Sequence, residues 1–256
     1  MNTISVITVT HNAAATIEET IRSVAEQSYP HIEHIVVDGG STDGTLGVIR
    51  KHRSKIAAFV TEPDRGMYDA MNKGLRLATG DIVGFLNADD SYADSYVLET
   101  IARTMEQQKV DACYSDLVYV DKNNRNRVVR YWQSQPYREG LFEKGWMPAH
   151  PTFYAKRWIY EKYGGYDLSY RRQSDFELTM RLLAVHKIKS AYIPKVLVHM
   201  RSGGLSGGLW HILEGNIESY RACRKHALNV TPLFIARKIL SRVPQFFHRD
   251  RFGASP

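Results

Sequence analysis

Short apolar runs alternate with amphipathic stretches over the first part of the chain. The apolar runs are rich in β-branched residues and have the length of buried strands, at 5–10, 34–38, 56–61 and 82–87. Between them, residues such as Ile17, Ile21 and Val24 recur at helical spacing and predict helices after Thr16 and at 43–52 and 67–77. Thr16 and Glu19 have the spacing of a capping box. Strands that alternate with helices form parallel sheets, so we expect an α/β fold.

The pattern becomes mixed in the second half. After a helix expected at 96–108, the polar segment 122–126 has the composition of a hairpin turn, and strand-like stretches flank it at 112–121 and 127–132. The remaining predicted elements are a helix, a strand and a glycine-rich, mobile loop, at 175–186, 191–198 and 202–208. We expect the two halves to share one sheet, because no linker or repeat separates them.

Chain length limits the number of domains. The 256 residues, 43% of them hydrophobic, suffice for one well-buried domain and are too few for two enzymatic domains. Cys113 and Cys223 lie far apart without a C-x-x-C partner, so neither a zinc site nor a disulfide framework is indicated. The sequence contains no run of about 18 apolar residues and no leader peptide, so we expect a cytoplasmic protein.

The excess of positive charge is concentrated near the C-terminus. The chain has 34 basic and 27 acidic residues, a net charge of +7, and the segment 219–256 contains eight basic residues against Asp250 alone. The preceding 218 residues are therefore neutral overall, which argues against a protein that binds nucleic acid.

The basic C-terminal segment has helical periodicity. An apolar stripe recurs at spacings of three and four, with basic residues toward the other side: the stripe is Leu233, Ala236, Leu240, Val243 and Phe247, and the basic residues are Lys238, Arg242 and Arg249. Two interpretations remain open. The segment 219–252 lies in an anionic membrane surface, which would place the protein at the inner face of the cell membrane, or it packs on the body with its basic face in solvent.

Acidic residues follow two of the predicted strands. Asp38 ends one strand, and Asn87-Ala88-Asp89-Asp90 follows another, where ligands bind in open α/β sheets. Carboxylates at a rigid strand end suit Mg²⁺ or Mn²⁺, with diphosphate oxygens and water as the other ligands. Each motif has an alternative interpretation: an Asx turn or N-cap for Asn87–Asp90, and a turn-stabilising aspartate for Asp38 instead of an acceptor for a nucleobase imide N–H.

Two nucleotide-binding motifs are absent from the sequence. The glycines after Asp38 do not form G-x-G-x-x-G, and G-x-x-x-x-G-K-[ST] occurs nowhere in the chain. These absences argue against a dinucleotide-dependent oxidoreductase and against P-loop phosphoryl transfer.

Several ordered motifs resemble the family 2 glycosyltransferases. They span about the first 205 residues: the runs 5–12, 36–45, 62–74, 78–81 and 85–90, and then His150-Pro151-Thr152, Gly164-Gly165-Tyr166-Asp167 and Ser174-Asp175. The resemblance implies a GT-A fold with a catalytic domain at 1–208, whose halves 1–110 and 111–208 hold the nucleotide sugar and the acceptor. The basic segment 209–256 lies beyond this domain.

The same resemblance assigns roles to residues of the donor half. It implies nucleotide binding by five residues, with Asp38 on the nucleobase: Thr10, Asn12, Asp38, Asp64 and Asn87. Asp89 is the implied ligand of Mn²⁺ or Mg²⁺, with Asp90 as second ligand and His199 as a further candidate. The chain departs from the family's D-x-D pattern, because Asn87 occupies the first position.

On the acceptor side, the resemblance marks Asp175 as the general base. A carboxylate in reach of the acceptor hydroxyl takes its proton while the oxygen attacks the anomeric carbon. Ser174-x-x-Glu177 also has the spacing of a capping box, and a helix start is a rigid mount for a base, so the two interpretations are compatible. His150 and Arg201 are the other acceptor-side candidates. A lone histidine is more often a packed residue, and Arg201 would add a cationic contact to phosphate. The loop 202–208 is a candidate lid over the donor.

These inferences lead to one main hypothesis and two alternatives. The main hypothesis is an inverting transfer from a nucleotide-diphosphate sugar, UDP-sugar favoured, to a glycan or polyprenyl-diphosphate-linked sugar in exopolysaccharide, capsule or O-antigen synthesis. A catalytically silent nucleotide-sugar-binding scaffold at the membrane is the second hypothesis, and Asn87 is its best support. A glycosidase with two carboxylates about 5–9.5 Å apart is the third, but it needs neither a metal nor a nucleobase contact.

Overall fold

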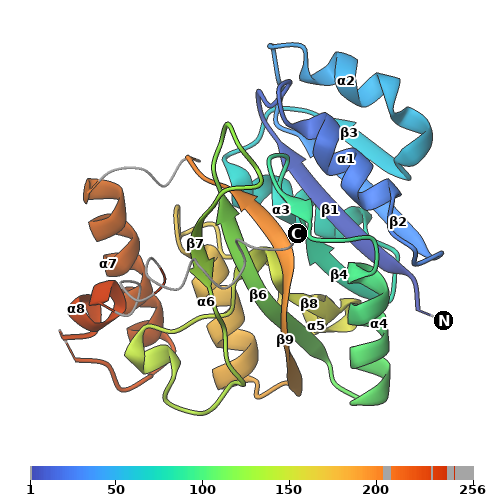
Figure 1. Cartoon of the computed structure of the whole chain (residues 1–256). Coiled ribbons are helices and arrows are strands. Elements are labelled where there is room, and N and C mark those ends of the chain that lie inside the picture. Colours follow the sequence, from blue (N-terminus) through green and yellow to red (C-terminus); the bar gives the residue numbers. More distant parts are fainter. Residues whose placement is uncertain (1, 204–208, 232, 241–244, 246–256) are drawn as a thin grey trace.

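A computed structural model describes residues 2–203, 209–231, 233–240 and 245. Figure 1 shows a central sheet with helices on both faces. The strands are β1 Ile4–Thr10, β2 Ile32–Asp38, β3 Ala58–Thr61, β4 Ile82–Phe85, β5 Ser91–Tyr92, β6 Ala112–Val120, β7 Val128–Trp132, β8 Tyr154–Lys156 and β9 Ser190–Arg201. The helices are α1 Ile17–Ala25, α2 Thr45–Lys51, α3 Met67–Leu77, α4 Val97–Gln107, α5 Arg157–Tyr163, α6 Ser174–Met180, α7 Leu209–Lys225 and α8 Leu233–Leu240.

The strands form one mostly parallel sheet in the order β3-β2-β1-β4-β8-β6-β9-β5, with β7 paired to β6. β1, β2, β3 and β4 run parallel, and so do β6 and β9. β8 lies antiparallel between β4 and β6 and so joins the two halves into one sheet. The carboxyl ends of β1, β2, β3 and β4 therefore meet at one edge, where the predicted donor residues lie.

Alternate side chains of the strands supply two separate cores. Along β1, Ile7 packs in the core that contains Met71 of α3 and Phe176 of α6, whereas Val6 packs in the core that contains Ile101 of α4. This alternation follows from the two-residue period of a strand that is buried on both faces. The mixed α/β fold with a mostly parallel sheet and helices on both faces is confirmed, and α3 has the predicted bounds.

Other local predictions were wrong or incomplete. Neither predicted capping box forms: no side-chain hydrogen bond caps α1 or α6, and Ser174 lies inside α6. The glutamates have other partners, because Glu19 pairs with Arg125 and Glu177 with Arg181. α6 is also shorter than predicted and continues as a π-helical turn at Arg181–Val185, while β8 and α5 were not predicted.

The C-terminal helix α8 packs by a different face from the one predicted. Leu233 and Leu240 of the apolar stripe are 61% and 66% exposed, whereas Phe234 and Lys238 are buried. Lys238, predicted on the solvent side, donates through Nζ to Gln173 Oε1 at 2.9 Å and lies 4.1 Å from the Phe176 ring centroid. A hydrogen-bonded cation over an aromatic ring tolerates this burial. Val243, Phe247, Arg242 and Arg249 lie outside the described residues, and none of the described helices is long and apolar enough to cross a membrane.

Candidate functional site

The Asp38 carboxylate accepts four hydrogen bonds, three from its own turn and one from β3. Its Oδ2 accepts hydrogen bonds from the N–H of Gly40 at 3.1 Å, the N–H of Ser41 at 2.9 Å and the hydroxyl of Thr61 at 2.7 Å. Its Oδ1 accepts one from the Ser41 hydroxyl at 2.5 Å, and the residue has 0% exposure. Burial raises the pKa of Asp38, but these hydrogen bonds outweigh it and hold the pKa below its usual value. These are the contacts of a turn-stabilising aspartate.

Thr10 and Asn12 lie next to this turn. Thr10 pairs with Asp38 in the parallel register of β1 and β2, and its buried hydroxyl oxygen has no hydrogen-bond partner among the residues that the structure describes. Asn12 has a left-handed backbone, φ 52°, and its side-chain oxygen accepts the N–H of Thr42 at 2.9 Å. The ends of β1 and β2 are thus fixed together.

Asp64, in the loop after β3, also lies at the end of β2, against Gly39. Its Oδ1 accepts the N–H of Gly66 at 2.8 Å, and its Oδ2 lies 2.4 Å from the position that a Cβ of residue 39 would take. Asp64 is half-buried, and no hydrogen bond to Oδ2 joins it to another described residue. The structure therefore brings Thr10, Asn12, Asp38 and Asp64 together, as the sequence analysis expects.

The acidic motif after β4 holds one buried and one partly exposed carboxylate. Asp90 is fully buried; its Oδ2 accepts from Asn87 Nδ2 at 3.2 Å and its Oδ1 from the Arg201 N–H at 3.4 Å. Burial, and then the charge of Asp89, raise the pKa of Asp90 well above its ordinary value. Burial also raises the pKa of Asp89. Two adjacent carboxylates in this state would be stabilised by a cation.

The donor set around this motif is small. Among the residues that the structure describes, no three histidine, cysteine, aspartate or glutamate side chains gather as metal ligands. His199 pairs with Ser91 across β9 and β5, and its pKa is lowered by burial and then by Arg125. Asp89 beside Asp90 fits an Mg²⁺ or Mn²⁺ ion that takes its remaining ligands from a substrate diphosphate and water.

Arg201 lies beside this acidic motif. Besides the contact of its N–H with Asp90, its guanidinium is 3.6 Å from the Glu19 carboxylate, which also pairs with Arg125 of the β6–β7 hairpin. His150, in contrast, packs against Phe85, the last residue of β4. The acceptor-side roles of Arg201 and His150 stay predictions.

Asp175, the predicted base, sits in the first turn of α6. Its Oδ1 accepts the hydroxyl of Tyr68 at 3.1 Å and the N–H of Phe176 at 2.8 Å. Its Oδ2 has no hydrogen bond with any described residue, and the side chain is half-buried. Burial, followed by the charge of Asp175, raises the pKa of Tyr68 well above its usual value, so this phenol remains a hydrogen-bond donor. One carboxylate oxygen is thus oriented, and the other makes no hydrogen bond within the described part of the chain.

A chain of aromatic rings links Asp175 to the end of β4. Tyr68 stacks on Tyr166 with ring centroids 5.4 Å apart, and Tyr166 contacts Phe85 of β4 edge-on at 5.3 Å. His150 is buried and bonds Tyr166 Oη through Nε2 at 2.5 Å, and burial lowers its pKa. His150 therefore has the contacts of a packed histidine. Among the described residues, no hydrogen bond or ion pair joins Asp175 to Asp89 or Asp90, and the rings extend from Asp175 as far as Phe85 at the end of β4.

Three residues that support the site were not identified from the sequence. Tyr68 and Tyr166 lie within matched motifs, but no pattern marks them as the contacts of Asp175 and His150. Glu218 of α7 accepts the N–H groups of Arg171, Arg172 and Gln173, at 3.0, 2.9 and 3.0 Å, and so fixes the loop before Asp175. Only the tertiary structure brings Glu218 to this loop.

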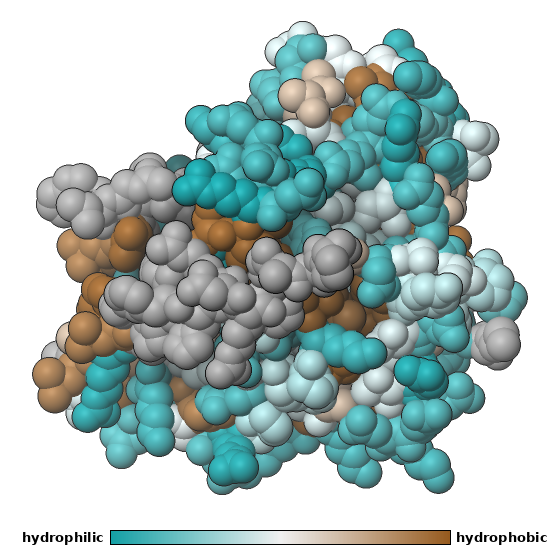
Figure 2. Space-filling model, in the orientation of Figure 1, coloured by the Kyte–Doolittle hydropathy of each residue, from teal (hydrophilic) through white to brown (hydrophobic). Residues whose placement is uncertain are grey.

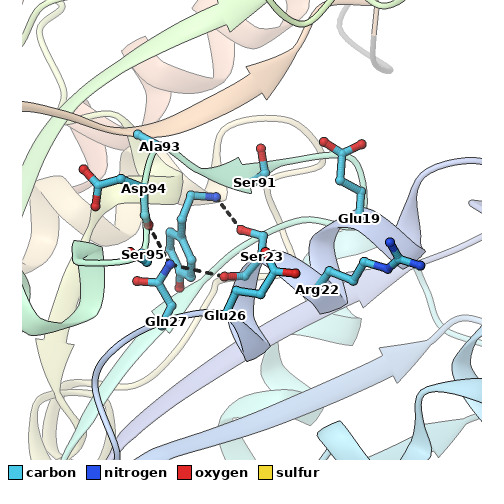
Figure 3. A pocket seen from close by; sticks show the side chains of 10 residues that line it. Glu19, Arg22, Ser23, Glu26, Gln27, Ser91, Ala93, Asp94 and Ser95 are labelled. Atoms are coloured by element: carbon cyan, nitrogen blue, oxygen red, sulfur yellow. Dashed lines mark hydrogen bonds between the residues drawn. The ribbon is translucent and has the colours of Figure 1, made fainter.

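A cavity of about 410 Å³ lies between α1 and the segment around β5. Figure 3 shows Glu19 and Arg22 at one side and Asp94 at the other, with Gln27 hydrogen-bonded to Asp94 O at 2.7 Å. None of the predicted site residues lines it. Of the candidate lid, residues 202–208, only Ser202 and Gly203 lie within the described residues, and the N–H of Ser202 donates to Val120 O at 2.8 Å.

Comparison with known proteins gives matches over most of the chain. The model of the family "Glycosyl transferase family 2" matches residues 5–166. A "PGL/p-HBAD biosynthesis glycosyltransferase" of Mycobacterium tuberculosis is 31% identical over 206 residues, 79% of this chain and 78% of the relative. A "Putative teichuronic acid biosynthesis glycosyltransferase TuaG" of Bacillus subtilis is 37% identical over 107 residues, 41% of this chain and 42% of the relative.

Solved structures share the fold. S. aureus TarS 1-349 in complex with UDP-GlcNAc has a TM-score of 0.68 and 21% identity, over 98% of this chain and 70% of that chain. The mannosyltransferase PcManGT from Pyrobaculum calidifontis, in complex with GDP-Man and Mn²⁺, has a TM-score of 0.66 and 23% identity, over 94% of this chain and 69% of that chain.

Proposed function

This chain belongs to glycosyl transferase family 2, and from this premise we propose that it moves a sugar, with inversion, from a nucleotide diphosphate to an acceptor hydroxyl. A UDP-sugar is the favoured donor. The observation that carries the proposal is the half-buried Asp175 carboxylate, which has one oxygen held by Tyr68 and the other open. A single displacement needs a fixed base of this kind next to the donor.

The proposed site divides along the sheet. The donor nucleotide binds at the ends of β1, β2 and β3, where Thr10, Asn12 and Asp64 lie beside the turn that Asp38 stabilises. The acceptor hydroxyl approaches from α6, where Asp175 Oδ2 takes its proton as the new bond forms. Asp175 then returns this proton to solvent after the product leaves.

A divalent metal ion, Mn²⁺ or Mg²⁺, would be held by Asp89 with Asp90 beside it, and when bound it would neutralise charge on the departing diphosphate. Asp90 and Asn87 keep this loop in place through their mutual hydrogen bond at 3.2 Å. Asn87 thus has a structural contact in the position where the family pattern has an aspartate, and Asp89 is the partly exposed carboxylate of the motif.

The relatives suggest a class of acceptor. The Mycobacterium and Bacillus proteins are named for PGL/p-HBAD and teichuronic acid biosynthesis. This supports a role in cell-envelope or polysaccharide assembly, with a glycan or a polyprenyl-diphosphate-linked sugar as the acceptor.

A lipid-linked acceptor also agrees with the outer surface of α7 and α8. Figure 2 shows apolar residues gathered on the side of the molecule where α7 and α8 lie. The exposed apolar residues there include Ile212, Leu213, Leu233, Ile239 and Leu240, and the exposed basic residues include Arg221, Arg224 and Arg237. Apolar side chains with basic neighbours favour an anionic lipid interface, so we propose peripheral attachment at the inner face of the cell membrane.

The proposal is tested by donor turnover. Purified protein with Mn²⁺ is given UDP-, GDP- and dTDP-sugars, with and without lipid-linked acceptors, and nucleotide release and the anomeric configuration of the product are measured. We expect one donor to react with inversion. Folded protein that binds a donor and releases no nucleotide with any acceptor would instead favour the silent scaffold, and a product of retained configuration would contradict the single displacement.

A further inference from the structure

The carboxylates of Asp38 and Asp64 both lie where the nucleotide is proposed to bind. Only Asp64 has an oxygen without a hydrogen bond to another described residue. Asp38 was expected to contact the nucleobase, but its four hydrogen bonds come from its own turn and from Thr61, and it has 0% exposure. Asp64 is half-buried and uses only Oδ1 in its own loop. A buried, fully bonded acceptor cannot take another donor without losing one of its present partners.

Gly39 and Gly40, which follow Asp38, meet different structural requirements. Gly40 has φ +84°, a left-handed conformation that favours glycine whatever its neighbours are. Gly39 has no such backbone requirement, because its φ is not positive. A Cβ on Gly39 would, however, lie 2.4 Å from Asp64 Oδ2 and 3.1 Å from its carboxyl carbon. The missing side chain at position 39 is therefore what lets the Asp64 carboxylate rest over the end of β2.

The loop that carries Asp64 is fixed on both sides. The N–H of Glu62 donates to Asp38 O at 3.0 Å, and Lys73 Nζ from α3 donates to Pro63 O at 2.8 Å. The Asp64 carboxylate is thus held in place before any ligand binds. Preorganisation of this kind reduces the entropic cost of binding.

We propose that Asp64, and not Asp38, is the residue that recognises the nucleobase of the donor, and that this base presents a single imide N–H, as uracil and thymine do. The inference rests on the proposed function and names the donor class for that site. Asp64 Oδ2 accepts the imide N–H, while Oδ1 stays bonded to Gly66. Guanine presents two adjacent donors and would need both oxygens, so it fits this carboxylate less well.

The test compares a ligand that has the base with one that lacks it. Calorimetry measures the affinity of wild type, Asp64→Asn and Asp64→Ala for UDP, GDP and pyrophosphate in the presence of Mn²⁺. We expect UDP to bind more tightly than GDP to wild type, and each variant to lose about 10- to 100-fold in UDP affinity with pyrophosphate affinity unchanged. Asp81→Asn, at the exposed opposite end of β4, is the matched control and should leave all affinities unchanged.

Two further variants separate Asp64 from Asp38. Gly39→Ala displaces the Asp64 carboxylate and should reproduce the base-selective loss in UDP affinity, with the melting temperature little changed. Asp38→Asn should lower the melting temperature, because it removes a buried acceptor of backbone N–H groups. Wild-type UDP affinity in folded Asp64→Asn, an equal loss for pyrophosphate, or tighter wild-type binding of GDP than of UDP would each overturn the proposal.

The outcome is independent of whether the protein turns over a donor. Suppose that Asp64→Asn loses affinity for UDP but not for pyrophosphate, and that wild type transfers no sugar. This result would support Asp64 as the nucleobase contact and reject the proposed reaction. Sugar transfer by wild type, with unchanged UDP affinity in Asp64→Asn, would support the proposed reaction and reject Asp64 as the nucleobase contact.

Discussion

Tyr68→Phe removes one hydroxyl from the contacts of the proposed base. The ring stays, so its stacking on Tyr166 at 5.4 Å is kept. The hydroxyl lost is the one that lies 3.1 Å from Asp175 Oδ1 and 3.0 Å from Arg172 O. A hydrogen bond to a charged acceptor is worth about 1.5–3 kcal/mol. Because the Phe176 N–H still holds Oδ1 at 2.8 Å, we expect the lower end of that range, about a 10-fold fall in kcat.

The assay measures kcat and KM for the donor, with donor affinity from calorimetry. Donor affinity should be unchanged, because Tyr68 contacts Asp175, the proposed general base, and none of the residues proposed to bind the nucleotide. The fall in kcat should be the same from about pH 6 to 9, since burial raises the pKa of Tyr68 well above that range and the phenol is a donor throughout. Tyr29→Phe, which removes a hydroxyl bonded to Asn2 O, is the control and should keep the wild-type kcat.

A lower melting temperature with an unchanged kcat would refute this reasoning, because Tyr68 would then stabilise the fold without orienting the base. An equal loss of kcat and donor affinity would also refute it.

Three other predictions test the metal, a surface ion pair and the membrane surface. Removal of divalent metal with EDTA should abolish nucleotide release, and Mn²⁺ should restore it; turnover without metal would contradict the role given to Asp89. Burial raises the pKa of Asp167, but hydrogen bonds from Lys225 and Ser169 lower it from 3.8 to about 2. The stability that this depressed pKa contributes is present above pH 3.8 and is lost as the pH falls toward 2. Wild type should therefore melt at a higher temperature than Asp167→Asn above pH 3.8, and the difference should disappear toward pH 2. A difference that stays constant over this interval would contradict the pairing. The double variant Leu233→Ser with Leu240→Ser should bind anionic vesicles more weakly and keep wild-type turnover on a soluble acceptor, and unchanged vesicle binding would reject this surface.

Elements with strong periodicity could be predicted from the sequence, and elements that depend on distant partners could not. β1, α3 and the β6–β7 hairpin follow from local patterns and were found close to their predicted positions. β8 has three residues and forms only because β4 and β6 lie on either side of it. The capping boxes did not form, because Glu19 pairs with Arg125 of the β6–β7 hairpin and Glu177 pairs with Arg181 one turn along and with His226 just after α7.

The candidate site shows the same division. The strand ends that carry Asp38 and Asp89 could be predicted, because parallel strands bring their carboxyl ends together. The sequence could not show that Ser41 and Thr61 would occupy the Asp38 carboxylate, or that Gly39 would make room for Asp64. Nor could helical periodicity show that Lys238 would be buried over Phe176, because that contact depends on where α8 docks.

The central claim, that Asp175 accepts the proton of the acceptor hydroxyl, is tested most directly by Asp175→Asn. The variant keeps the size of the side chain and removes its basicity. We predict that its affinity for the donor equals that of wild type while kcat falls by about 10²- to 10⁴-fold, the usual contribution of a general base. Turnover at the wild-type rate in folded Asp175→Asn would contradict the account.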